Sequence, residues 1–247
     1  MIVKRISSLV GSSAALIVSA SLCSTAQIPR HTIQTAVNGQ GITEVTLVNT
    51  SNVPITAIHV TFLCSPYPAE ISLDALVEGT VNGSIPSQGT FRYEIPPLAA
   101  ACPGGIEDIA YADSVHEGSV IGRERTINRR RAVYDEVTKV KAWIQAIPAS
   151  EWNSARYLSF AIARQEQLKN DQVMPKTKAF DEKQVRMEAM SALIRRIQGI
   201  DPPHNQAILT QEQALRIMNK WVNVLGDALK LDGVVEASSN ETTSYVF

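Results

Sequence analysis

The stretch ITEVTLVNTSNVPITAIHVTFLC, residues 42–64, decides the fold of the first half of the chain. Residues 42–49 place Val45 and Leu47 on one face and Glu44 and Thr46 on the other. Residues 55–64 alternate in the same way, and polar residues fill the short turn between the two runs. Alternation with period two is typical of β-strands, and two such runs joined by a short polar turn predict a hairpin.

Further strands are expected on both sides of this stretch, at residues 31–37, 71–76, 90–95 and 106–112. Pro and Gly residues separate them, as expected for the connections between strands. About six short strands at this spacing predict an antiparallel β-sandwich or a small barrel.

From about residue 118 the spacing of apolar residues changes to that of a helix. A first long helix is indicated by one stripe, which consists of Val133, Val137, Val140, Ile144 and Ile147. Pro148 ends this helix, and Ser150 is the expected cap of the next one.

Three more helices follow by the same reasoning. The second covers residues 151–168, with the stripe Trp152, Ala155, Leu158 and Ile162, and the third covers residues 179–198 and ends at Gly199. Thr210 and Gln213 form a capping box for the fourth. The sequence therefore predicts an α+β protein, with an N-terminal antiparallel β-sandwich followed by about four helices.

The first 26 residues have the layout of a secretory signal peptide. Lys4 and Arg5 precede an apolar, serine-containing stretch, and small residues follow at cleavage spacing. Two alternatives are a membrane anchor, for which the stretch is short, and a lipid anchor on Cys23, which follows the bulky Leu22. The predicted organisation is a signal peptide at 1–26, a β-sandwich domain at 27–117, a helical domain at 118–232 and a flexible tail at 233–247.

The mature chain keeps Cys64 and Cys102, which are expected to form a disulfide in an oxidising compartment. The bridge would close a loop of about 39 residues and stabilise the fold by on the order of 4 kcal/mol. Two free buried thiols are the alternative. Neither cysteine has partners at zinc spacing, so no metal and no cofactor are predicted.

The chain of 247 residues has a formal net charge of -1, which argues against a nucleic-acid partner. One local positive patch stands at the start of the long helix and comprises Arg123, Arg125, Arg129, Arg130 and Arg131. Because guanidinium groups match phosphate and carboxylate geometry, these residues are candidates for contact with an anionic envelope component or an envelope protein. The alternative is a solvated helix face balanced by nearby acidic residues.

A second cluster, Asp113, His116 and Glu117, lies where the strands give way to the helices. Three possible ligands in five residues suggest a metal-dependent hydrolase as an alternative function. The competing interpretation is a junction turn, with Asp113 as a cap and Glu117 near the start of the following helix. No Gly-x-Ser-x-Gly motif is present, and no catalytic residues can be assigned.

Two short motifs resemble a known group of proteins. They are VNTSNVPITA, residues 48–57, and IAYAD, residues 109–113, the latter followed by Glu117-Gly118 before the arginine-rich helix. In these motifs the chain resembles a group of uncharacterised exported bacterial proteins. That resemblance implies a secreted, Ig-like β-domain of unknown activity and supplies no catalytic residues.

Together these patterns predict that the protein is secreted or periplasmic. The predicted function is that of a non-enzymatic binding or scaffold module of the cell envelope or secreted space. No later segment is long and apolar enough to span a bilayer once the signal is removed. Three Asn-x-Ser/Thr patterns, at Asn49, Asn82 and Asn240, fit a glycosylation acceptor.

Overall fold

The computed structural model describes residues 30–37, 43–62, 69–79, 84–95, 104–175, 177–199 and 210–233. The chain divides into two compact units, Met1–Arg30 and His31–Phe247, and the account below concerns the second. Several predicted features lie outside the described residues: the signal peptide, Cys23, both partners of the expected disulfide (Cys64 and Cys102), and the tail from residue 234.

The first half of the described chain forms two antiparallel sheets. The first sheet has the order β1-β2-β5 and consists of β1 (His31–Val37), β2 (Thr43–Asn49) and β5 (Thr90–Ile95). The second has the order β4-β3-β6-β7 and consists of β4 (Ala69–Asp74), β3 (Ile55–Phe62), β6 (Gly104–Tyr111) and β7 (His116–Gly118). The prediction of antiparallel strands is confirmed, and the short strand β7 is an addition.

The predicted hairpin at residues 42–64 is wrong, because β2 and β3 belong to different sheets. Asn49 is the physical reason: its side-chain amide is fully buried and donates to the carbonyls of Val53, Ile85 and Pro86 at 2.8–3.3 Å. These bonds fix residues 50–54 as an arch, not a tight turn that would pair the strands. The same bonds occupy the amide nitrogen that a glycan at Asn49 would require.

One hydrophobic cluster takes side chains from both sheets. Val45 and Leu47 come from the first sheet, and Ile58, Val60 and Ile109 from the second, and all are at most 3% exposed. β3 is buried on both of its faces from residue 55 to residue 60. The arch fixed by Asn49 takes the chain from the first sheet to the second. Strands β2 and β3 therefore bury apolar side chains in the same cluster, although they belong to different sheets.

The second half consists of four α-helices, as predicted. They are α2 (Val120–Ala146), α3 (Ser154–Asn170), α4 (Lys178–Gln198) and α5 (Gln211–Leu231), with a short 3-10 helix η1 (Ala149–Glu151). Gly199 ends α4 in the left-handed conformation, and the capping box at Thr210 is present. The cap of α3 is Asn153, not the predicted Ser150, because residues 149–151 form the 3-10 turn.

A second hydrophobic cluster lies among the helices and confirms most of the predicted stripe of α2. Val133, Val137, Val140 and Ile144 belong to the cluster, and Ile147 is buried just after the helix ends.

The predicted stripe of α3 is only partly right: Trp152 and Leu158 pack against the cluster, but Ala155 and Ile162 are exposed. The buried residues of the helix are Tyr157, Ala161 and Leu168. The true stripe includes Arg164, whose guanidinium binds the buried carboxylate of Glu136 through two hydrogen bonds of 2.5 and 2.8 Å. Because this face of α3 includes a charged residue paired with a buried carboxylate, apolar spacing alone could not reveal it.

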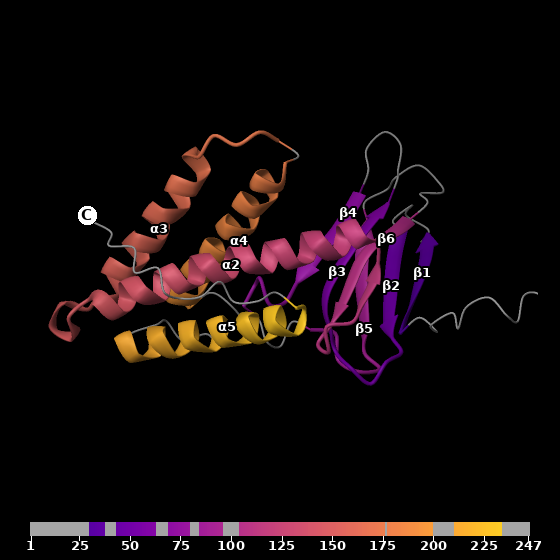
Figure 1. Ribbon diagram of the computed structural model, residues 1–247, viewed down its shortest axis with the longest axis horizontal. Coiled ribbons are helices and arrows are strands. Elements are labelled where there is room, and N and C mark those ends of the chain that lie inside the picture. The colour runs from indigo at the N-terminus through magenta and orange to yellow at the C-terminus, as the bar shows by residue number, and fades with distance from the viewer. Residues whose placement is uncertain are drawn as a thin grey trace, which may run out of the picture. The chain divides into compact units, whose positions relative to one another are not determined.

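α2 links the sheets to the other helices. It contacts β6 and β7 near its start and α4 and α5 along its length, and Figure 1 shows α2 running between α4 and α5. Its first turn approaches β6 so closely that a Cβ atom at Gly122 would stand 2.0 Å from the carbonyl oxygen of Glu107. Only glycine fits this contact. In the described part of the chain, no helix is long and apolar enough to cross a membrane.

Candidate functional site

A layer of buried polar side chains separates the two hydrophobic clusters, on the face of the second sheet that meets α2. Arg130 lies at its centre and is 1% exposed. Its guanidinium donates to Asp74 at 2.9 Å and to Thr56 at 2.8 Å, and lies 3.7 Å from Asp232 at the end of α5. The strand ladder shifts register at Thr56, which marks a bulge in β3. Arg130 thus ties β3, β4 and α5 to α2.

His116 forms the second part of this layer. Its ring nitrogens bond to Asp108 at 2.9 Å and to Asp232 at 3.1 Å, and Asp108 also accepts from Thr126 at 2.6 Å. Burial lowers the pKa of His116, but the hydrogen bonds and charges of the two aspartates outweigh burial and raise this pKa from 6.5 to about 9. His116 is therefore an imidazolium at neutral pH and clamps the end of α5 against the sheet.

The structure does not gather Asp113, His116 and Glu117 into one site. Neighbouring residues of a strand point to opposite faces, so Glu117 turns away from His116. Glu117 accepts from His31 at 2.6 Å and from Tyr111 at 3.0 Å, not from the start of a helix. Asp113 is exposed and accepts from the amide of Val115 in a turn. No group of three His, Cys, Asp or Glu residues in the described ranges could hold a metal ion.

The five arginines of the predicted anion contact divide into two groups. Arg125, Arg129 and Arg130 bind carboxylates of the same chain. Arg123 and Arg131 are exposed. Contact with an anionic partner stays a prediction, for which Arg123 and Arg131 have accessible side chains.

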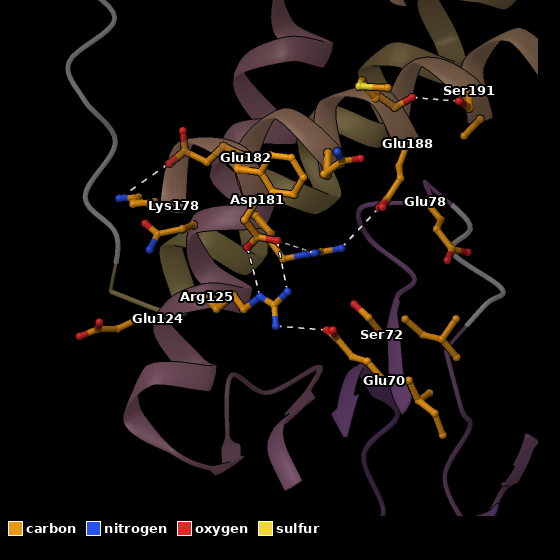
Figure 2. A pocket seen from close by; sticks show the side chains of 18 of the residues that line it. Glu70, Ser72, Glu78, Glu124, Arg125, Lys178, Asp181, Glu182, Glu188 and Ser191 are labelled. Atoms are coloured by element: carbon orange, nitrogen blue, oxygen red, sulfur yellow. Dashed lines mark hydrogen bonds and ion pairs between the residues drawn. The ribbon is translucent and has the colours of Figure 1, made fainter. Parts of the chain in front are cut away.

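A groove of about 1330 Å³ lies between β4, α2 and α4. Figure 2 shows Glu70 and Ser72 of β4 facing Arg125 of α2 and Asp181 of α4 across it. Four consecutive residues of β4, from Glu70 through Leu73, line the groove. Since successive side chains alternate between the two faces of a strand, the groove follows the edge of β4.

An ion-pair network holds the walls of the groove together. Arg125 lies 3.1 Å from Glu70, 3.2 Å from Glu107 and 3.2 Å from Asp181, and so joins β4, β6 and α4. Arg129 donates to Asp181 at 2.9 Å, one helical turn farther along α2. These ion pairs join the walls of the groove within the chain itself, and the pair of Arg129 with Asp181 is the more buried one.

A serine–histidine pair lies in the wall of the groove. Ser72 Oγ stands 2.9 Å from Nδ1 of His59, its neighbour across the β3–β4 ladder. Burial, reinforced by the positive charge of Arg129, lowers the pKa of His59 from 6.5 to about 4. A general base must accept a proton and become cationic, and this environment opposes that charge. The pair therefore suits a structural hydrogen bond better than nucleophilic catalysis.

Sequence reasoning missed the carboxylates that organise this region, namely Asp74, Asp108, Asp181 and Asp232. Asp74, Asp181 and Asp232 bind basic partners more than 50 residues away, so no local spacing pointed to them. Asp108 bonds to His116, eight residues later, across the β6–β7 pair. One signal was available: Thr56 and His59 interrupt a strand that is otherwise strongly apolar. Polar residues in a strand buried on both faces indicate partners on a covering element.

No protein-family model, no curated protein and no solved structure matches the chain.

Proposed function

We propose that this protein is a non-enzymatic binding or scaffold module, and that its partner occupies the groove between β4, α2 and α4. The observation that carries the proposal is the groove itself, about 1330 Å³ of open space beside a strand edge. Its walls are held by the pairings of Arg125 and Arg129, so the cavity is formed in advance. A groove whose described lining residues assemble no catalytic constellation suits recognition.

We further propose that the module is exported and acts in the periplasm or the secreted space. The N-terminal charge, apolar stretch and small residues support removal of residues 1–26. Cys64 and Cys102 would then be free to form the disulfide that an oxidising compartment favours. An Ig-like sandwich is the proposed arrangement of the two sheets, and their shared hydrophobic cluster supports it.

Intact mass of the protein from its natural source tests the export proposal. We expect loss of about the first 26 residues and a further 2 Da below the dithiol mass if the disulfide has formed. Recovery of the full-length, fully reduced chain would contradict both.

Site-specific photo-crosslinking in the living source cell tests the groove. A benzoylphenylalanine at Gln184, which lines the groove on α4, is compared with the same residue at Gln145, which is exposed on α2 outside it. We expect a discrete adduct from position 184 and none from position 145. Equal labelling at both positions, or no adduct at position 184, would remove the support for a partner in the groove.

A further inference from the structure

We infer that the groove binds an extended, basic segment of a partner polypeptide, which adds a strand to the edge of β4. This inference rests on the proposed function, since it names the kind of partner that the groove accepts. Backbone geometry, charge and exposed apolar side chains each contribute to it.

The backbone of β4 provides the first argument. β4 stands at the end of the order β4-β3-β6-β7, and within the described residues it pairs only with β3. An edge strand presents a row of N–H and C=O groups that can pair with another chain. Because the groove follows this edge, an extended peptide lying in it can form main-chain hydrogen bonds with β4.

The net charge of the groove indicates the sign of the charge that a bound peptide should carry. Six carboxylates and four cationic side chains line it, a net charge of −2. The lining carboxylates are Glu70, Glu78, Glu124, Asp181, Glu182 and Glu188, and the cationic groups are Arg125, Arg129, Lys178 and Arg195.

The pairing of the cationic groups reinforces this choice. Arg125 is engaged by Glu70, Glu107 and Asp181, and Arg129 by Asp181. An anionic ligand would have to displace these internal carboxylates. Glu70, Asp181 and Glu188 pair with the same arginines. Lys or Arg side chains of a peptide meet the remaining net negative charge, to which the exposed Glu124 contributes. The same pairings argue against a nucleic acid in the groove.

Exposed apolar residues lie beside the charged ones in the groove, which favours a peptide in which basic and apolar residues alternate. Ile121 is 78% exposed, and Tyr93 of β5 is 40% exposed, and both line the groove. An added strand directs successive side chains to opposite sides, toward the helices and toward β5. We therefore expect basic residues to alternate with β-branched or aromatic ones.

Selection from a displayed library of random ten-residue peptides on the full-length protein tests the inference. Peptides are retained only if a benzoylphenylalanine at position 184 crosslinks to them. We expect the retained peptides to carry Lys or Arg alternating with apolar residues. The strongest peptide should lose affinity at least tenfold when alternate backbone nitrogens are methylated in one of the two possible registers.

Matched variants locate the contacts without touching the core. Ile121→Ala, in the groove, should weaken the selected peptide several-fold, whereas Val120→Ala, next to it, equally exposed and outside the groove, should not. Glu124→Gln should weaken binding and reduce its salt dependence. The remote Glu212→Gln on α5 should change neither.

The outcomes separate this inference from the proposed function. Retained peptides that are acidic, or that bind undiminished after both methylation patterns, would overturn the basic added strand while leaving a partner site in the groove. Competition by a single-stranded oligonucleotide with the crosslink at position 184 would overturn it as well. If no peptide is retained and position 184 gives no adduct in cells, both proposals fall.

Discussion

Replacement of the buried Arg130 by methionine should cause one of the largest losses of stability that a single substitution can produce here. Arg130 donates to Asp74 and Thr56 and faces Asp232, and the side chains of both aspartates are fully buried. Methionine fills much of the space but leaves Asp74 without its cation, whereas Asp232 keeps its bond to His116. Removal of one partner of a buried ion pair costs about 3–5 kcal/mol, because the remaining charge is uncompensated.

Equilibrium unfolding in guanidinium chloride measures this loss. With a slope of about 5 kcal/mol per M, a loss of that size lowers the unfolding midpoint by about 0.6–1 M. Near-UV circular dichroism is a suitable signal, since Trp221 donates to the carbonyl of Leu76 just after β4 and reports on this region.

Two controls make the result specific. Arg123→Met, on the exposed face of the same helix, should change stability by less than about 0.5 kcal/mol. The double variant Arg130→Met/Asp74→Asn also removes the buried carboxylate charge that has lost its partner. It should therefore recover part of the lost stability. A loss below about 1 kcal/mol for Arg130→Met, or a double variant less stable than the single one, would refute the reasoning.

Three further perturbations test other parts of the structure. Burial lowers the pKa of His116, but its hydrogen bonds to two aspartates and their charges outweigh burial and raise the folded-state pKa to about 9. Its stabilisation is therefore complete below pH 6.5 and is lost as the pH rises through 9, so unfolding at several pH values should show a decline on the order of 3 kcal/mol that His116→Gln abolishes. Gly122→Ala should destabilise by roughly 1–3 kcal/mol because its Cβ would stand 2.0 Å from a β6 carbonyl oxygen, whereas Gly105→Ala, with open space around its Cβ, should leave the melting temperature nearly unchanged. Asn49→Ala should cost about 1–3 kcal/mol by calorimetry because three carbonyl acceptors lose their donor, and an equal loss from the exposed Asn52→Ala would contradict the role given to the arch.

Most elements of the fold could be predicted because each one depends on neighbours along the chain. Alternation gave the strands, and caps such as Thr210 and the glycine at 199 gave the helix ends to within a residue or two. The pairing of β2 with β5, and not with β3, could not be predicted, because it follows from buried hydrogen bonds of Asn49 to carbonyls 36 and 37 residues away.

The candidate site was predictable only in part. The arginine cluster at the start of α2 was visible, but the function of each arginine was not. Helical periodicity turns Arg130 inward and Arg131 outward, and only the carboxylates supplied by β4, α4 and α5 decide that the inward ones are paired. The hypothesis of one contact with an anionic partner grouped all five arginines together. The fold pairs Arg125, Arg129 and Arg130 with carboxylates of the same chain and leaves Arg123 and Arg131 exposed.

By itself, the sequence determined the antiparallel strands, the four helices and most of the apolar face of α2, since these follow from local periodicity and from capping residues. Only the tertiary structure decided that the second sheet meets α2 through a layer of buried charges, and that a groove opens beside β4. The physical reason is that buried ion pairs and strand edges depend on which distant segments come together, and that information is absent from any short stretch of the chain.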